Sequence, residues 1–381
     1  METSLYIHFP FCLKKCLYCD FNSLAGSRIK AGDYIAAAVR EMALRAEKVA
    51  APVSAPTLYI GGGTPSLMEP SLVGRLIDTA ARLYGLAAGA EITLEANPGT
   101  LTAEKLAGYR AAGVNRLSLG VQSFDDAMLG VLGRVHTARE ALDSYATARA
   151  TGFVNIGIDL IHSLPGQTPE MWRGELTRAI DLGPEHVSAY GLTVEEGTPF
   201  QRLESDGRLS LPDEDAAVTM FRETGAVLGR AGYERYEISN FARPGFRSRH
   251  NQVYWRRGNY LGFGAGAHSF LRSPGFGVRW RNPLSPEAYL AAVSCAVIPE
   301  EDMTTLAERD AMSEFFFLGL RLREGVEEAQ FCRDFGRTVE EAYREELAEL
   351  LAEGLIEREA GFLRLSERGL LLANRVFMRF V

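Results

Sequence analysis

Short apolar segments alternate with helical patterns through the first half of the chain, and this alternation limits the possible fold more than any other feature. Each apolar segment has the length of a buried strand and is followed by an amphipathic stretch, which is typical of parallel strands joined by crossover helices. The strand-like segments are 4–8, 57–60, 91–96, 116–121, 154–161 and 186–192. These units predict an α/β fold, a partial (β/α)6 TIM-like barrel, in which chemistry takes place at the carboxyl ends of the strands.

The pattern changes near residue 210, and it predicts three domains. Residues 1–210 form the barrel, and residues 211–303 form an α+β extension that includes a stretch rich in Gly, Arg and aromatic residues. Residues 304–381 are mainly helical, with two strand-like segments at 355–358 and 361–365 that are typical of a hairpin. We therefore expect a smaller, winged-helix-like region at the end of the chain.

The composition excludes several classes of protein. With 381 residues, 46% of them hydrophobic, the chain is long enough to bury a large core. Its net charge of −8 argues against nucleic acid as a partner. No secretory signal precedes the cysteines described next, and no apolar run is long enough to span a membrane. We therefore expect a cytoplasmic protein with at most peripheral membrane association.

Three cysteines stand within eight residues: Cys12, Cys16 and Cys19. Their odd number and their crowding on one loop make a disulfide framework a poor interpretation. Three thiolates in this arrangement can hold three corners of an iron–sulfur cluster and leave the fourth iron open. A zinc site with His8 as the fourth ligand is the alternative. The remaining cysteines, Cys295 and Cys332, are interpreted as ordinary thiols without a role.

Six motifs spread along the chain resemble those of the radical SAM proteins, which use S-adenosylmethionine (SAM). They are Y-I-H-F-P-F-C-x3-C-x-Y-C from Tyr6, G-G-G-T-P-S from Gly61, E-A-N-P-G from Glu95, G-V-Q-S-F from Gly120, L-G-R-V-H from Leu132 and D-L-I-H-S-L-P-G-Q from Asp159. More narrowly, the chain resembles the branch that contains oxygen-independent coproporphyrinogen III dehydrogenase and the HemW heme chaperones. The resemblance covers nearly the whole chain and implies a partial barrel of the radical SAM type.

The resemblance also implies two cofactors and the residues that hold them. A [4Fe–4S] cluster would sit on the three cysteines, and SAM would chelate the open iron. The implied SAM residues are Tyr6, Tyr18, Gly62, Gly63, Thr64, Glu95, Gln122, Arg134, Asp159 and Thr193. Glycines let the backbone approach closely, an arginine can pair with a carboxylate, and carboxylates suit the amine and the ribose hydroxyls. From the residues alone, the glycine run is also compatible with a plain strand-to-helix turn, and Asp159 with a helix cap.

Two features separate the members of this branch. The dehydrogenase has a further cysteine two residues after the third ligand, where this sequence has Phe21. The dehydrogenase also has a long N-terminal extension before its first cysteine, whereas Cys12 lies close to the start of this sequence. Both departures favour the heme chaperones.

A second motif, H-N-x-x-Y-W, matches a HemW signature that is tied to heme binding. Its side chains are His250, Asn251, Tyr254 and Trp255. Imidazole is a common axial ligand of heme iron, and the two aromatic rings can stack on the macrocycle. Four arginines suit the heme propionates: Arg247, Arg249, Arg256 and Arg257. His268 is a second candidate ligand. The alternative is a hydrogen-bonded interface histidine among core aromatics.

The sequence therefore predicts a heme chaperone that binds heme and delivers it to an apo-hemoprotein, such as a respiratory cytochrome, with the help of the cluster and SAM. Catalytic turnover is auxiliary or absent in this interpretation, and the family implies a homodimer. The enzyme alternative is an oxygen-independent coproporphyrinogen III oxidase or dehydrogenase. A third possibility is a related radical SAM methyltransferase or heme-degrading enzyme.

Overall fold

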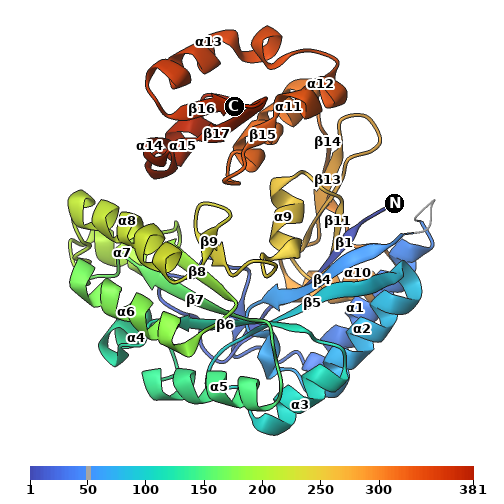
Figure 1. Ribbon diagram of the computed structural model, residues 1–381. Coiled ribbons are helices and arrows are strands. Elements are labelled where there is room, and N and C mark those ends of the chain that lie inside the picture. Colours follow the sequence, from blue (N-terminus) through green and yellow to red (C-terminus); the bar gives the residue numbers. More distant parts are fainter. Residues whose placement is uncertain (49–52) are drawn as a thin grey trace.

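A curved sheet with helices on its outer face dominates the computed structural model, which describes residues 1–48 and 53–381 (Figure 1). Six strands pair in parallel, in chain order: β1 (Ser4–Phe9), β4 (Ala55–Gly62), β5 (Leu86–Ala96), β6 (Arg116–Gln122), β7 (Ile156–His162) and β8 (His186–Gly191). Each of the strand segments predicted from the sequence overlaps one of them. The predicted partial barrel is therefore confirmed.

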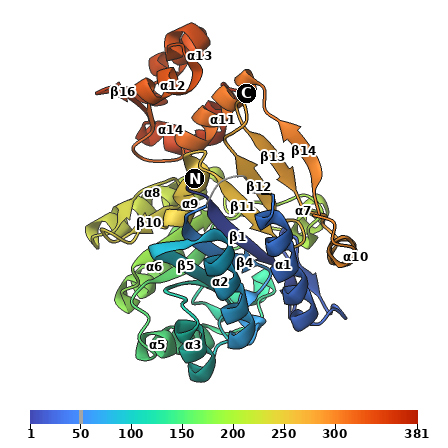
Figure 2. The ribbon, with the colours of Figure 1, turned by 90° about the vertical axis from the view of Figure 1, so that its right-hand side faces the viewer.

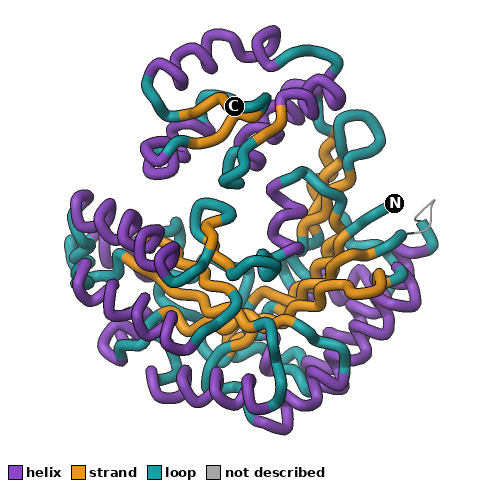
Figure 3. The backbone as a smooth tube through the Cα atoms, viewed as in Figure 1, coloured by secondary structure: helices purple, strands orange, loops and turns teal. Residues whose placement is uncertain are grey.

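Helices cover the outside of this sheet, as the purple helices around the orange strands show in Figure 3. The helices between and after the strands are α1 (Ala31–Ala46), α2 (Pro70–Tyr84), α3 (Ala103–Ala111), α4 (Asp126–Leu132), α5 (Ala138–Ala150), α6 (Pro169–Leu182), α7 (Pro199–Ser205) and α8 (Glu214–Arg230). A short 3-10 turn, η1 (Pro65–Leu67), follows β4. Successive strand residues point to opposite faces, so Leu117, Leu119 and Val121 of β6 are buried under the helices. Their neighbours in the strand point into the barrel.

Further strands extend this sheet at both edges. On the β1 side, β11 (Tyr260–Phe263) pairs in parallel, and β12 (His268–Leu271), β13 (Val278–Arg281) and β14 (Glu301–Thr305) follow in antiparallel pairs. On the β8 side, β10 (Asn240–Ala242) and β9 (Glu234–Arg235) are antiparallel. Two helices, α9 (Arg249–Trp255) and α10 (Pro286–Ser294), belong to the same stretch. Residues 211–303 thus share the sheet of the barrel, and the three-domain division stays a proposal.

The C-terminal region has a core of its own (Figure 2). Its elements are α11 (Glu308–Gly319), β15 (Val326–Glu327), α12 (Glu328–Phe335), α13 (Val339–Ala352), β16 (Ile356–Glu359), β17 (Phe362–Leu365), α14 (Glu367–Leu371) and α15 (Ala373–Phe377). Strand β17 lies between β15 and β16 in a three-stranded sheet. The core is aromatic, with the rings of Phe316 and Phe380 stacked at 4.2 Å. Helices beside a small hairpin-containing sheet confirm the predicted winged-helix-like region.

None of the helices in the described part of the chain is long and apolar enough to cross a membrane.

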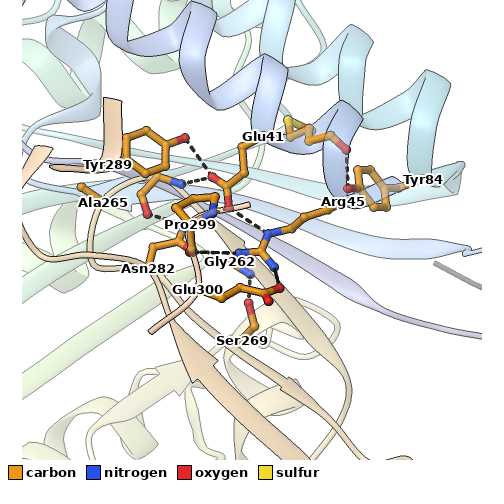
Figure 4. A network of polar contacts seen from close by, with 12 residues as sticks. Glu41, Arg45, Tyr84, Gly262, Ala265, Ser269, Asn282, Tyr289, Pro299 and Glu300 are labelled. Atoms are coloured by element: carbon orange, nitrogen blue, oxygen red, sulfur yellow. Dashed lines mark hydrogen bonds and ion pairs between the residues drawn. The ribbon is translucent and has the colours of Figure 1, made fainter. Parts of the chain in front are cut away.

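A buried polar network ties α1 to the extension of the sheet (Figure 4). The Glu41 carboxylate accepts hydrogen bonds from Arg45 Nε at 2.8 Å, Tyr289 Oη at 2.8 Å, the Gly264 amide at 2.9 Å and Asn282 Nδ2 at 2.9 Å. Arg45 in turn donates to Glu300 and to Asn282. Since a buried charge is tolerated only when it is paired and hydrogen-bonded, this carboxylate fixes three distant segments around itself.

We predict that Glu41→Ala lowers the free energy of unfolding by about 3–5 kcal/mol, because it removes the fully buried carboxylate that pairs with the buried Arg45 charge. Urea denaturation followed by circular dichroism measures the change. Glu47→Ala, at an exposed position just after the same helix, is the matched control and should change stability by less than about 0.5 kcal/mol. Equal effects of the two substitutions would contradict the role assigned to the network.

Candidate functional site

The three predicted cluster cysteines lie on the loop that leaves the carboxyl end of β1. The loop is closed by a parallel pair of two-residue strands, β2 (Phe11–Cys12) and β3 (Leu24–Ala25). Its middle is anchored to the barrel, because Leu17 bonds through its backbone to Leu132 at 3.0 Å and to Phe200 at 3.1 Å. All three thiols are partly buried and free of disulfides.

Neighbouring side chains supply hydrogen bonds and charge to two of these sulfurs. Thr64 Oγ1 donates to Cys12 Sγ at 3.4 Å, and Arg134 Nη1 donates to Cys16 Sγ at 3.4 Å. The thiolate is the form of cysteine that binds metal. This donor set fits three ligands of an iron–sulfur cluster.

The glycine run after β4 packs directly beneath the cysteine loop. A Cβ on Gly63 would lie 2.8 Å from the Phe11 carbonyl oxygen and 2.9 Å from Cys12 Sγ, so no side chain fits there. Gly62 has a φ of 119°, a conformation that favours glycine. The run is therefore more than a plain turn, because it lets two backbones approach at the cysteines.

A cavity of about 490 Å³ joins the cysteine loop to the interior of the barrel. It is lined by the three cysteines and by nine of the ten predicted SAM residues: Tyr18, Gly62, Gly63, Thr64, Glu95, Gln122, Arg134, Asp159 and Thr193. The tenth, Tyr6, does not line the cavity; its hydroxyl is 2.9 Å from His8 Nδ1, and its ring stacks on Tyr59 with centroids 6.2 Å apart. The structure thus gathers residues from strands β4 to β8 and from the loop after β1 around one space.

Two carboxyl groups face this cavity from neighbouring parts of the sheet. Glu95 accepts hydrogen bonds from Tyr59 Oη at 2.7 Å and from the Gly62 amide at 3.0 Å, and burial raises its pKa to about 7. Asp159 accepts from the hydroxyls of Ser118 at 2.9 Å and Ser188 at 2.6 Å, and burial raises its pKa as well. Because Asp159 lies within β7, the helix-cap interpretation is wrong.

Arg134 is held by a residue that the sequence reasoning missed. Its Nη2 donates to Asn97 Oδ1 at 2.6 Å and to the Gly120 carbonyl at 2.7 Å, and Asn97 Nδ2 donates to Thr64 Oγ1 at 3.1 Å. Asn97 also lines the cavity. Asn97 is part of the E-A-N-P-G motif, and this motif was the sequence signal that could have identified it.

Gln122 shows backbone strain at the end of β6. Its φ of 68° lies in the left-handed region, which is costly for a residue other than glycine. Such outliers persist where surrounding structure holds them and are common at functional sites. The strained residue lines the cavity.

His8 is already engaged and does not serve as a fourth zinc ligand in this arrangement. Its Nδ1 is hydrogen-bonded to Tyr6 Oη, and its Nε2 lies 2.8 Å from the Asn22 carbonyl oxygen. The side chain is 6% exposed. The zinc alternative thereby loses the ligand on which it depended.

The H-N-x-x-Y-W motif forms α9, which lies in the opening of the curved sheet (Figure 1). His250 is buried, with Nδ1 2.7 Å from Thr57 Oγ1 and Nε2 2.8 Å from Tyr254 Oη. Its ring stacks on Tyr59 at 5.0 Å, and burial lowers its pKa to about 3. The imidazole is therefore neutral, and both of its nitrogens are occupied by hydrogen bonds.

The other end of α9 borders a second cavity, of about 330 Å³, beside the C-terminal region. Trp255 lines it together with Arg256, Arg257 and Arg272. Trp255 Nε1 is buried and has no hydrogen-bond partner among the described residues.

The four arginines predicted to meet propionates all have partners. Arg247 pairs with Glu234, Arg249 donates to the Gly89 carbonyl, Arg256 pairs with Glu324, and Arg257 pairs with Glu314. The Arg257 pair is buried, whereas the Arg256 pair is exposed at both ends. Only an exposed pair exchanges its partner at little cost.

His268, the second candidate ligand, shares a small cavity of about 180 Å³ with Tyr254. The side chain is exposed, and within the described residues its ring makes no hydrogen bond. Partial desolvation in this cavity and the neighbouring Arg279 and Arg281 lower its pKa, which favours the neutral imidazole that binds iron.

Comparison with known proteins shows the family to which the chain belongs. The chain matches the family model of the radical SAM superfamily over residues 6–178 and that of the HemN C-terminal domain over residues 306–372. It is 37% identical to the heme chaperone HemW of Bacillus subtilis, with 99% of each chain covered. It is also 37% identical to the heme chaperone HemW of Escherichia coli, with 99% of this chain and 98% of that one covered.

Among solved structures, the chain is similar to the coproporphyrinogen III oxidase HemN of Escherichia coli, a radical SAM enzyme. The TM-score is 0.84 at 25% identity, with 100% of this chain and 90% of that chain covered. The heme chaperones are thus closer in sequence than this oxidase, although the fold is shared. From the motifs, the fold and these full-length similarities, the chain belongs to the HemW family of the radical SAM superfamily.

Proposed function

We propose that this protein is a heme chaperone that holds a [4Fe–4S] cluster and SAM in its barrel and binds heme beside α9. The observation that carries the proposal is the position of α9, because Asn251 lines the barrel cavity and Trp255 lines the second cavity. The relatives at 37% identity bear the name heme chaperone, which supports the same function. The acceptor would be an apo-hemoprotein such as a respiratory cytochrome. A cytoplasmic location and a homodimer are part of the proposal.

The barrel residues fit the two proposed cofactors in complementary ways. Cys12, Cys16 and Cys19 would hold the cluster, which when bound supplies a single electron to SAM. Arg134 offers a fixed cation for a carboxylate, since Asn97 and the Gly120 carbonyl orient its guanidinium. The ionised forms of Glu95 and Asp159 would accept hydrogen bonds from the amine and ribose hydroxyls of SAM.

For heme, we propose a site built on α9 and β12. Trp255 offers a ring face, and the exposed Arg256 and Arg272 can exchange Glu324 and Asp334 for a propionate. His268 offers an open imidazole beside Tyr254. Ligation by His250 would require α9 to release it from Thr57, so His250 is proposed chiefly as the residue that anchors α9.

The function is tested on protein reconstituted with iron and sulfide under anaerobic conditions. We predict that it binds heme, transfers it to an apo-cytochrome, and forms no protoporphyrinogen from coproporphyrinogen with SAM and a reductant. Loss of cluster absorbance in Cys16→Ser, with full absorbance in Cys332→Ser, controls for correct loading. Robust protoporphyrinogen formation by the wild type would replace the chaperone function with the oxidase.

The raised pKa of Glu95 predicts that SAM binding strengthens as pH rises. Below pH 7 the free carboxyl is mostly protonated and has to lose its proton before it accepts from the SAM amine. Between pH 6 and pH 8 we expect SAM affinity for the cluster-loaded protein to rise about tenfold, by equilibrium dialysis. In Glu95→Gln the profile should be flat over this range. An unchanged slope in that variant would assign the titration to another group.

The axial ligand is tested by comparing two histidine variants. We predict that His268→Ala loses the imidazole signature in the heme absorption and electron paramagnetic resonance spectra. His250→Ala should keep this signature while unfolding at lower denaturant, because the Thr57 and Tyr254 hydrogen bonds that hold α9 are lost. The reverse result, with the signature lost only in His250→Ala, would show that α9 moves and that His250 is the ligand.

A further inference from the structure

An arginine in the middle of the barrel has no use in the functions described so far. Arg116 begins β6, is 2% exposed, and lines the 490 Å³ cavity. Within residues 1–48 and 53–381 its guanidinium makes no hydrogen bond and no ion pair, and its buried Nε lacks a partner. A guanidinium carries five N–H donors. In Arg116 these donors have no acceptor among the described residues.

A second unpartnered group lies beside it. His186, at the start of β8, is bonded through Nε2 to Tyr236 Oη at 2.8 Å, and its buried Nδ1 has no partner among the described residues. A Cβ on Gly157 would lie 3.3 Å from His186 Nδ1 and 3.4 Å from Arg116 Nη2. The two side chains thus converge on one place, which the missing side chain of Gly157 leaves open.

The nearby carboxylates balance the charge of Arg116 without using its donors. Glu91 accepts from the amides of Arg249 at 3.0 Å and His250 at 2.9 Å, at the start of α9. Asp159 accepts from two serine hydroxyls, as described above. Both carboxylates raise the pKa of Arg116 electrostatically, yet neither lies within ion-pair distance of its guanidinium. Glu91 and Asp159 therefore compensate the charge of Arg116 without contacting its guanidinium. The N–H donors of Arg116 have no acceptor among the described residues.

This place lies at the end of the cavity opposite the cysteines. Arg116 and His186 begin their strands, whereas the cysteine loop follows the carboxyl end of β1. Asn251 of α9 lines the same cavity. The proposed SAM residues Thr64 and Arg134 instead contact the cysteines directly. A ligand at Arg116 would therefore lie farther from the cysteines than these two SAM contacts.

We propose that Arg116 and His186, with Asn251 beside them, form a second subsite in the barrel that binds the carboxylate group of an organic ligand. A planar carboxylate takes two parallel hydrogen bonds from a guanidinium, which no single acceptor near Arg116 now provides. The carboxylate belongs either to a small free acid or to a propionate arm of a porphyrin. This subsite does not depend on heme transfer, and it holds whichever reaction the barrel supports.

The experiment measures carboxylate binding to the cluster-loaded protein without any assay of activity. Isothermal titration with propionate should show millimolar binding to the wild type and at least tenfold weaker binding to Arg116→Met. Arg235→Met is the matched control, because Arg235 is also largely buried but stacks on Phe221 and Phe241 outside the cavity. Arg116→Lys keeps the positive charge beside Glu91 and Asp159 but lacks the two parallel N–H donors of the guanidinium. This variant therefore tests the planar donors separately from the charge.

Titration with mesoporphyrin and with its dimethyl ester identifies the source of the carboxylate. If Arg116→Lys weakens binding of the free acid porphyrin and leaves the ester unchanged, the subsite takes a propionate arm. If only propionate itself is affected, the subsite takes a small acid. Equal binding of every carboxylate probe to the wild type and to both Arg116 variants, or no binding to the wild type, would overturn the proposal and leave Arg116 as a charge balance for Glu91 and Asp159.

Discussion

The structure depends on a parallel sheet whose inner face is polar, although the same strands supply the apolar core on their outer face. Alternation along β6 places Leu117 and Leu119 under the helices and turns Arg116 and Ser118 toward the cavity. Charges buried in this way are stable only when they are compensated, and the carboxylates of the inner face find donors on neighbouring strands and on α9. Asp159 uses hydroxyls of the strands on either side, and Glu91 uses the amide groups at the start of α9. The helix is therefore part of the electrostatic balance of the barrel.

The fold was predictable because the outer face of each strand carries a recognisable apolar pattern. The functional residues that follow or lie near the ends of the strands were predictable for a second reason. Cys12, Gly63 and Asp159 belong to motifs whose residue types already indicate a functional site. Arg116 and His186 were not predictable as site residues. Each begins a strand, where a polar residue in a sequence marks an ordinary boundary, and only the closure of the barrel shows that their side chains point inward. Asn97 was missed because its role is to orient Arg134, a contact that no local pattern encodes.

The H-N-x-x-Y-W motif shows a different limit of prediction from sequence. The pattern pointed to the segment that forms α9, but it could not say which side chain is open. His250 is fixed by Thr57 on β4 and stacked on Tyr59, and both residues come from strands far earlier in the chain. His268 was the weaker candidate in the sequence. Its imidazole makes no hydrogen bond among the described residues, because it lies on β12 in the outer part of the sheet. Whether an imidazole is open depends on tertiary contacts, which no local sequence pattern encodes.

Helix α9 also provides a physical connection between the two halves of the proposed function. It has seven residues, with Asn251 facing the barrel cavity and Trp255 facing the cavity beside the C-terminal region. Its first turn is held by Glu91 and Thr57, while its last residue packs under the guanidinium of Arg321 at 4.4 Å. Because α9 is this short, a displacement of one end would also displace the other end. Any ligand that displaces Trp255 must therefore work against the hydrogen bonds of Glu91, and these in turn lie beside the charge of Arg116.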